Sequence, residues 1–390
     1  MYFTSEPEHI SMLRETIGRF AEKELTDDKL RAWDKASEVP LDVFHRFAET
    51  GICGVTIDEE YGGSGRDLVA AVAVIDELAQ RGGAALAGPF IHCAFYGGVN
   101  ISENGSEQQK RELLPKLAAG EILMAYGLSE PNVGGDLATV ETTAKLSDDK
   151  TTVTVNGTKR WCTGARVADY VICLVRSGEA DAKYKNLSMV MVPLDAPGIE
   201  IFDLDHTGLR YAKTTDVVFT DVEIPVENIL GGIENWNRGW NMLASEALDV
   251  EKLEITGVAL GIAAAAVDDA WEYAQQREQF GHLISGHQSI RHDLVEVKTK
   301  LQACRHMLYH AAHLAQNRMP CSVETSMAKL FVGDTALEIV LKCQQVMGAY
   351  GCSGEYAMER HVRDILVMPI VGGSSKMQKN NIAARLRLPG

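Results

Sequence analysis

The chain has 390 residues, of which 46% are apolar and 24% charged, with a formal net charge of −16. This composition excludes disorder as the main state, and the length predicts two or three globular domains. The surplus of acidic groups repels a phosphate backbone and an anionic membrane surface, so we expect no nucleic-acid partner and no membrane partner. The longest apolar run, Val258 to Val267, has about half of the ~20 residues that a membrane-spanning helix needs.

The ends of the chain and its cysteines predict a cytoplasmic protein of bacterial type. The first residues, MYFTSEPEH, include acidic side chains and no apolar core, which is typical neither of a secretory signal nor of a transit peptide. The eight cysteines form no Cys-x-x-Cys pair, so we expect reduced and mostly buried thiols.

Three regions with different residue patterns follow one another along the chain and predict an α+β multidomain protein. Residues 1–118 form a predicted N-terminal α-helical domain, because apolar residues recur there at three- and four-residue spacing, as at Ile10, Leu13, Ile17 and Phe20. Residues 119–232 contain short β-branched runs at 151–155, 170–175, 188–192 and 217–219. Such runs predict a central antiparallel β domain, a sandwich or a barrel, with one hairpin turn at Asn156-Gly157.

The last region, residues 233–390, is helical again. Long periodic segments run from Val258 to Ala274 and from Leu294 to Ala315, and Pro320 is the first clear break after them. Long helices with short connections favour an antiparallel bundle, so we expect a C-terminal four-helix bundle.

Two segments of the β region carry residues suited to a planar cofactor. The segment 126–136 combines a hydroxyl, a proline turn and the pair Gly134-Gly135, whose backbone N–H groups can approach a phosphate or a ring edge. In the segment 155–164 the two-residue period places Trp161 and Thr163 on one face of a strand, where an indole can wall a planar ring. The alternatives are a plain interdomain loop for the first segment and a buried tryptophan for the second.

Three further motifs complete a recognisable series. They are the segment 273–281 followed by His287-Gln288, the segment 345–351, and Arg363-Asp364 followed by the segment 372–378. In this order and at these spacings the five motifs resemble the acyl-CoA dehydrogenase family over essentially the whole chain.

The resemblance implies that FAD binds non-covalently between the β domain and the C-terminal helices. It places Tyr126, Leu128 and Ser129 against the flavin ring, Trp161 over one face of it and Thr163 near its N5 atom. Gly135 would approach the pyrophosphate through its backbone, although the family usually has a serine there. The adenosine diphosphate part would be held by a neighbouring subunit, through Arg277, Phe280 and Gln288 together with Gln345 and Gly348. The shared site implies a homotetramer built as a dimer of dimers. Ser374 of the last motif is a further predicted FAD residue.

The resemblance also implies the reaction: a carboxylate removes the α-proton of an acyl-CoA, the β-hydride passes to the flavin, and an electron-transfer flavoprotein or similar acceptor takes up the electrons. The usual position of the base is a glycine here, Gly372. Counting back from Ala259-Leu-Gly261 places Glu251 on the glutamate that some branches of the family use instead, resembling the isovaleryl- and long-chain enzymes. We expect Glu251 to be catalytic and its neighbours Asp249 and Lys252 to contact the substrate.

Two alternatives stay open at this point. One is a relative that lacks the base and keeps FAD, such as a desulfinase or an enoyl-CoA reductase. The other is a non-catalytic subunit of a hetero-oligomeric dehydrogenase. We expect no metal site, because the histidines that share one helix face, His306, His310 and His313, have no carboxylate beside them in the sequence.

Overall fold

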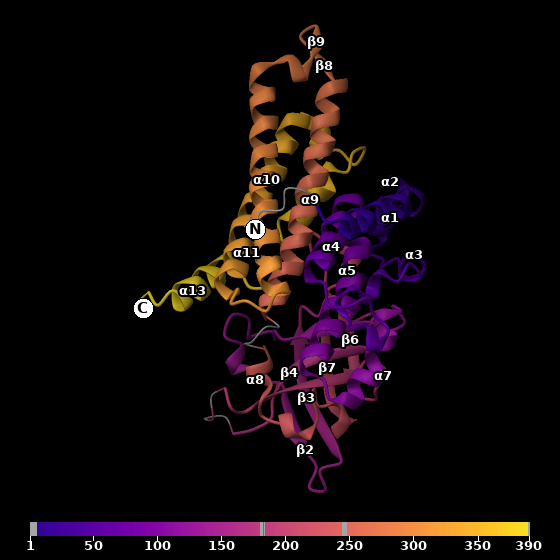
Figure 1. The fold of residues 1–390 in the computed structure, drawn as a ribbon, viewed down its shortest axis with the longest axis vertical. Helices are drawn as coiled ribbons and strands as arrows, with labels where there is room; N and C mark the ends of the chain where they lie inside the picture. Colours follow the sequence, from indigo (N-terminus) through magenta and orange to yellow (C-terminus); the bar gives the residue numbers. More distant parts are fainter. Residues whose placement is uncertain (1–5, 180–181, 183, 244–247, 389–390) are drawn as a thin grey trace.

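The structure is a computed structural model, and it describes residues 6–179, 182, 184–243 and 248–388. A β region lies at one end of the molecule and a long helical bundle at the other, with the N-terminal helices packed beside their junction (Figure 1). This is the predicted order of helical, β and helical regions. Within the described residues no helix has the length and apolar character needed to cross a membrane.

The N-terminal region consists of short helices around one central, almost fully buried helix, α4. The helices are α1 (Glu8–Glu24), α2 (Asp27–Ala36), α3 (Leu41–Ala48), α4 (Leu68–Gly82), α5 (Ala84–Ile91), α6 (Asn100–Asn104) and α7 (Glu107–Ala118). The Asp67 side chain caps α4 by accepting a hydrogen bond from the Ala70 N–H at 2.8 Å. Its apolar faces are buried because α4 packs against both α1 and the C-terminal helix α9 (Leu248–Gln276).

A π-helical segment, η3, joins α5 to α6 and covers His92–Val99. The π-helix is rare and occurs mostly as a single turn at functional sites. The sequence pattern of this stretch is only apolar, so nothing in it predicts the wider turn.

The β region is one seven-stranded sheet in the order β1-β4-β2-β3-β7-β6, with β5 paired to the other edge of β4. The strands are β1 (Met124–Gly127), β2 (Thr143–Leu146), β3 (Thr152–Arg160), β4 (Tyr170–Arg176), β5 (Leu187–Pro193), β6 (Ile199–Asp203) and β7 (Thr215–Pro225). Most pairs are antiparallel as predicted, but β4 runs parallel to both β1 and β2. The expected, mainly antiparallel β domain is thus present, but the prediction did not include its two parallel pairs.

The predicted hairpin turn at Asn156-Gly157 was wrong, because both residues lie inside β3. The register with β7 shifts between Val155 and Gly157, which marks a bulge. Gly157 has a φ of 141°, and a Cβ there would lie 2.6 Å from the Thr142 hydroxyl. Glycine at this position thus serves a bulge and a close strand contact rather than a chain reversal.

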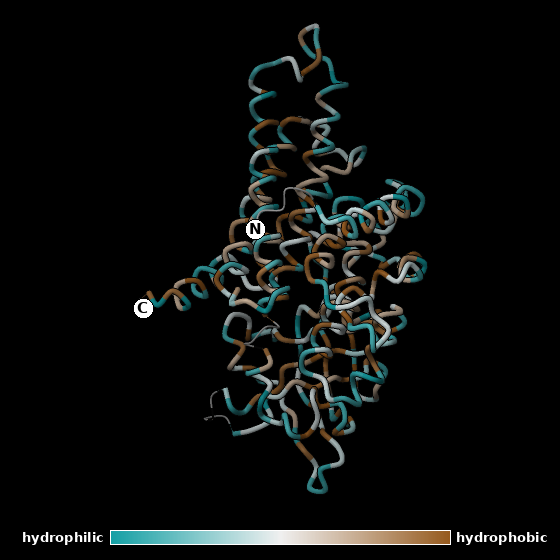
Figure 2. Tube along the Cα trace, in the orientation of Figure 1, coloured by the Kyte–Doolittle hydropathy of each residue, from teal (hydrophilic) through white to brown (hydrophobic). Residues whose placement is uncertain are grey.

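Among the described residues, the C-terminal region has three long helices and three shorter ones. Helix α9 runs away from the β region, α10 (Gln288–Gln316) returns, and α11 (Ser322–Met347) runs outward again (Figure 1). In Figure 2 the trace of α10 alternates between hydrophilic and hydrophobic patches, and its buried residues Leu294, Val297, Leu301, Cys304 and Leu308 repeat at the predicted helical spacing. The helices α8 (Gly239–Met242), α12 (Met358–Ile365) and α13 (Ser375–Arg385) complete the region, and the strands β8 (Glu278–Gln279) and β9 (His282–Leu283) form a hairpin at its far tip.

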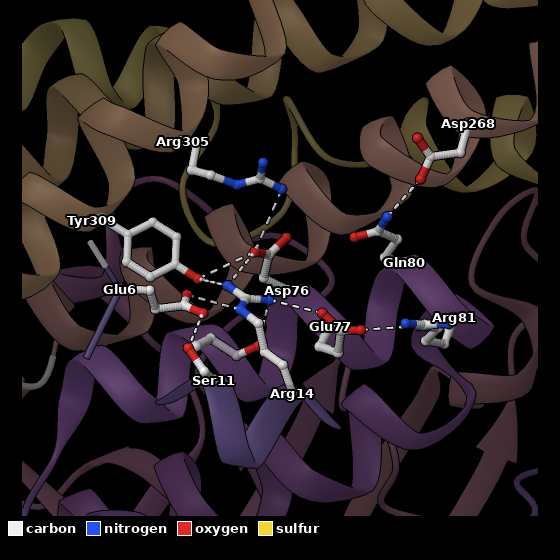
Figure 3. A network of polar contacts seen from close by, with 11 residues as sticks. Glu6, Ser11, Arg14, Asp76, Glu77, Gln80, Arg81, Asp268, Arg305 and Tyr309 are labelled. Atoms are coloured by element: carbon white, nitrogen blue, oxygen red, sulfur yellow. Dashed lines mark hydrogen bonds and ion pairs between the residues drawn. The ribbon is translucent and has the colours of Figure 1, made fainter. Parts of the chain in front are cut away.

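A buried polar network fixes the N-terminal helices to the bundle (Figure 3). The guanidinium of Arg14 on α1 lies 3.0 Å from the Asp76 carboxylate and 2.9 Å from the Glu77 carboxylate, both on α4. The Tyr309 hydroxyl on α10 donates to Asp76 at 3.2 Å. Because Asp76 is fully buried, this network specifies how three helices from two regions pack against one another.

Candidate active site

A cavity of about 700 Å³ opens where the three regions meet. The N-terminal wall comes from α5 and η3, the β wall from the loops after β1, β3 and β6, and the C-terminal wall from the first turns of α9 and α11, the segment 367–373 and α13. Of the predicted site residues, those that line it are Tyr126, Leu128, Ser129, Gly135, Trp161, Thr163, Asp249, Glu251 and Lys252.

The loop after β1 is held against β3 by a buried ion pair. The Lys159 ammonium donates to the Leu128 carbonyl at 3.1 Å and to the Glu130 carboxylate at 2.7 Å. Burial alone would raise the pKa of Glu130, but the Lys159 charge and hydrogen bonds from Glu141 and Thr142 lower it, so the carboxylate is ionised. The pair fixes the backbone of the loop that carries Ser129 and Gly135.

The Trp161 indole lies in the β wall of the cavity and remains 54% exposed. It is not on a strand, as the two-residue period suggested, because β3 ends at Arg160 and Trp161 has a φ of 66°. The Arg160 guanidinium covers the indole at 4.8 Å from the ring centroid. The Thr163 hydroxyl lies 3.2 Å from that of Thr214, and both threonines line the cavity. A flat, exposed ring beside paired hydroxyls suits a planar ligand.

On the opposite wall, Asp249 and Lys252 bind one another rather than facing outward as single charges. The Lys252 ammonium donates to the Asp249 carboxylate at 2.7 Å, and the Ser322 and Thr325 hydroxyls on α11 donate to the same carboxylate at 2.5 and 3.3 Å. Both charged side chains are buried. The bonds that Asp249 accepts from Ser322 and Thr325 join the first turn of α9 to the first turn of α11.

Glu251 extends into the cavity from the same turn of α9. Burial raises the pKa of its carboxyl to about 7, and the nearby ammonium groups of Lys252 and Lys329 oppose the rise. Lys329 is itself fully buried and donates to the Met368 carbonyl at 2.7 Å. A carboxyl with a pKa near neutrality can take up and release a proton at physiological pH, as a general base requires.

A second carboxyl, Glu254, lies one turn along α9 and is fully buried. Neither of its oxygens has a hydrogen-bond partner among the described residues. Burial and the charge of Glu251 raise its pKa well above the ordinary value, against a smaller opposing effect of the Tyr96 hydroxyl. The neutral form is the one that a buried, unpaired carboxyl adopts at least cost.

Comparison with known proteins identifies the chain. Three family models match it: the N-terminal domain of acyl-CoA dehydrogenases at residues 7–121, the middle domain at 125–222 and the C-terminal domain at 237–387. An acyl-CoA dehydrogenase of Bacillus subtilis is 33% identical over 94% of this chain and 95% of its own length. The chain belongs to the acyl-CoA dehydrogenase family. As a member of this family it is an oxidoreductase and a flavoprotein.

Two further relatives span the whole chain. The structure of butyryl-CoA dehydrogenase from Megasphaera elsdenii superposes with a TM-score of 0.93 at 30% identity, over 99% of this chain and 100% of that one. The caffeyl-CoA reductase-Etf complex subunit CarC of Acetobacterium woodii is 32% identical over 99% of both chains. The family fold, with its middle β domain between two helical domains, is thus confirmed.

The remaining predicted cofactor residues lie away from the cavity. Arg277 and Phe280 sit at the hairpin at the tip of the bundle, Gln288 begins α10, and Gln345 and Gly348 lie at the end of α11. Phe280 is 91% exposed, and the Arg277 guanidinium lies 5.7 Å from the centre of the Tyr350 ring. Within one acyl-CoA dehydrogenase chain these residues form a separate exposed cluster. Ser374 caps α13 by accepting from the Met377 N–H, next to the cavity-lining Gly373.

Sequence reasoning missed the cavity residues of the N-terminal helices, of the connection between β6 and β7, and of helix α8. They are Gly88, Ile91, His92 and Tyr96 on one side, and His206, Leu209, Thr214 and Trp240 on the other. Apart from Leu209, which lies in the Gly208-Leu-Arg210 segment that the family resemblance includes, none belongs to such a motif. Apolar periodicity marks a buried helix without showing which side faces a cavity. In the described part of this acyl-CoA dehydrogenase, no group of three or more His, Cys, Asp or Glu side chains has the geometry to hold a metal ion.

Proposed function

We propose that the protein is an FAD-dependent dehydrogenase that converts an acyl-CoA thioester to the enoyl-CoA, with Glu251 as the base that takes the α-proton. The observation that carries the proposal is the Glu251 carboxyl, which lines the cavity with a pKa raised to about 7 by burial. It comes together with family membership and with the absence of a carboxylate at Gly372, which lines the same cavity.

The residues present fit a flavin. The exposed Trp161 indole offers a flat surface, and Gly134 and Gly135 line the cavity with exposed backbone. A Cβ at Gly135 would lie 3.1 Å from the Met377 sulfur, so a larger residue here would press on that side chain. We assign the ring to the surface formed by Tyr126, Leu128, Ser129, Trp161 and Thr163. Arg277, Phe280, Gln288, Gln345 and Gly348 of a neighbouring subunit would hold the distal part of FAD.

When bound, FAD would accept the hydride that leaves the β-carbon of the substrate. The chain itself supplies the proton acceptor, since ionised Glu251 forms an O–H bond as the α-carbon–hydrogen bond breaks. The Asp249–Lys252 pair fixes the turn of α9 that carries this carboxylate, and its bonds to Ser322 and Thr325 hold that turn in place. The apolar residues Leu248, Ile255 and Val258 line the cavity beside Glu251 and exclude water from the reacting carbons.

The partners follow from the same proposal. Reduced flavin needs an acceptor, and we propose an electron-transfer flavoprotein or similar carrier; the name of the relative CarC places that subunit in a complex with Etf. We further propose a homotetramer in the cytoplasm, because the second cluster of predicted FAD residues needs a neighbouring subunit to meet a cavity.

The substitution Glu251→Gln tests the proposal, because it preserves shape and removes the base. We expect the rate of flavin reduction by acyl-CoA, followed anaerobically by absorbance, to fall about 10²–10⁴-fold while FAD stays bound. Glu272→Gln is the matched control, since Glu272 is an exposed glutamate at the far end of the same helix. A variant that reduces its flavin as fast as the wild type shows that Glu251 is not the base.

A second candidate function is reduction of an enoyl-CoA, since one relative is named a subunit of a caffeyl-CoA reductase-Etf complex. The same site can return a proton from Glu251 to the α-carbon of an enoyl-CoA. Oxidation of prereduced flavin by enoyl-CoAs, compared with its reduction by acyl-CoAs, decides the direction. A colourless protein that copurifies with a homologue supports the non-catalytic subunit instead.

A further inference from the structure

His92 is a buried imidazole in the cavity wall. It is 4% exposed and lines the cavity from the first turn of η3. Its Nδ1 atom is fully buried without a hydrogen-bond partner among the described residues, so Nε2 is the ring nitrogen that can meet a ligand in the cavity. Most buried polar side chains in proteins are hydrogen-bonded, so an exception at a cavity calls for an explanation.

Packing alone holds the ring in place. A Cβ on Gly164 would lie 1.8 Å from the Cε1 atom of His92, so the ring rests directly on the backbone of the loop that carries Trp161 and Thr163. On its other side the Tyr96 ring lies 5.3 Å away, and Tyr96 in turn stacks on Tyr126 at 5.0 Å. The ring nitrogens therefore have a fixed position without using their hydrogen-bonding capacity.

The Tyr96 ring connects His92 with the proposed base. Burial, and then the nearby carboxyls of Glu254 and Glu251, raise the pKa of the Tyr96 hydroxyl, which places Tyr96 close to both carboxyls. A substrate whose α-carbon meets Glu251 can therefore extend its acyl group along the part of the wall that Tyr96 and His92 line.

The chemistry of the ring narrows what it can bind. Burial lowers the pKa of His92 to about 4, so the imidazole is neutral at physiological pH. A neutral imidazole offers one N–H donor and one acceptor. Nε2, as the donor or the acceptor, can therefore bond a hydroxyl or a carbonyl oxygen, whereas a carboxylate would call for a positive charge.

We propose that His92 is a specificity-determining residue that hydrogen-bonds an oxygen substituent, a hydroxyl or an oxo group, on the acyl chain of the substrate. The proposal rests on the proposed acyl-CoA function and names its substrate class: oxygen-bearing acyl-CoA thioesters in preference to plain alkyl or aryl ones. A site built to bond an oxygen rejects the analogue that lacks it, because the buried polar group is then left unpaired.

Matched ligand pairs test the proposal by calorimetric titration of the holoenzyme. The pairs are 4-hydroxybutyryl-CoA with butyryl-CoA, and 3-(4-hydroxyphenyl)propionyl-CoA with 3-phenylpropionyl-CoA. We expect at least one oxygenated member to bind about ten- to a hundredfold more tightly than its partner in the wild type. His92→Phe should abolish that preference, and His92→Asn, which keeps a donor and an acceptor, should restore part of it. His306→Phe, on an exposed face of α10, is the control.

Equal or weaker binding of the oxygenated member in both pairs overturns the proposal, as does a preference that survives in His92→Phe. Loss of flavin absorbance in the same samples measures flavin reduction by the acyl-CoA, and so tests the proposed dehydrogenation separately. If the preference depends on His92 but no acyl-CoA bleaches the flavin, dehydrogenation fails and the inference about His92 stands. If no acyl-CoA binds at all, both are overturned.

Discussion

Two positions in the cavity, 251 and 372, are alternative places for a base, and their local geometry differs. Gly372 has a φ of 61°, and a Cβ there would lie 3.0 Å from the Ile255 side chain. A side chain at 372 would therefore be strained in its backbone and would have to displace a residue one turn from Glu251. At position 251 the helix presents its side chain to the cavity in an ordinary helical conformation.

The raised pKa of Glu251 predicts how the reaction depends on pH. The base must be ionised, so kcat/KM for flavin reduction should fall about tenfold per pH unit below pH 7, where the carboxyl protonates, and level off above it. Because the Lys252 charge lowers this pKa, Lys252→Met should move the midpoint to higher pH, while Lys252→Arg should leave it in place. A profile with no inflection between pH 5 and about 8 would contradict the assignment.

For single residues, the sequence predicted the side chains that lie in motifs and missed those, such as His92, that only tertiary packing brings to the cavity. Glu251 was placed by counting from a glycine, and Trp161 by its neighbours in the chain. His92 has no such context: its role depends on Gly164, which is 72 positions away in the sequence and touches its ring. Contacts of this kind follow from tertiary packing, which local patterns do not encode.

Among the elements, β3 joins the interior of the sheet to the cavity. Its last residues, Lys159 and Arg160, support the loop after β1 through Leu128, Ser129 and Glu130. The loop that we assign to the flavin therefore depends on one buried lysine.

Lys159→Met should destabilise the protein by about 3–5 kcal/mol, because it leaves the Glu130 carboxylate buried without its partner. We also expect faster loss of FAD on gel filtration, since the loop loses its anchor. Thermal unfolding of the holoenzyme measures the first effect and the flavin-to-protein absorbance ratio the second. Lys145→Met, on the exposed side of β2, is the control. The double variant Glu130→Gln/Lys159→Met removes the unpaired charge and keeps an acceptor for a backbone N–H of Glu141 or Thr142, so it should recover part of the stability. Equal melting of Lys159→Met and the control would show that the pair contributes nothing.

The elements themselves were predicted to different degrees. The long helices followed from apolar spacing, and α9 begins ten residues before the first apolar residue of the predicted segment, Val258, because its first turn carries the buried polar pair Asp249–Lys252. The sheet was expected from β-branched runs, but its parallel pairs were not, since strand order depends on which crossovers the loops make. Asn156-Gly157 looked like a hairpin because the same dipeptide serves turns and bulges.

On the scale of the whole molecule, the predicted cofactor residues fall into two clusters at opposite ends of the bundle. One lines the cavity, and the other surrounds the β8–β9 hairpin at the far tip (Figure 1). Within one chain the two do not meet, so a single FAD can touch both only if a second subunit contributes its tip.

Arg277→Ala should therefore weaken FAD retention and shift the oligomer towards smaller species together, because bound cofactor stabilises the assembly by mass action. Gel filtration with detection of both protein and flavin absorbance measures the two effects at once. Arg19→Ala, on the exposed face of α1, should change neither. Stoichiometric FAD and an unchanged elution volume for Arg277→Ala would refute the shared site.

Because Gly164 touches the His92 ring, the substitutions that each of these two positions can accept in evolution depend on the residue at the other. Any side chain added at 164 meets the imidazole first, since its Cβ would fall 1.8 Å from the ring, and it also inherits a φ of 77°. A lineage that keeps a large residue at 92 is therefore confined to glycine at 164, whereas one that first shrinks residue 92 opens the loop to asparagine or other residues that tolerate a left-handed backbone. Under the proposed role of His92, the order in which these substitutions arise also affects which acyl groups a descendant enzyme can bind.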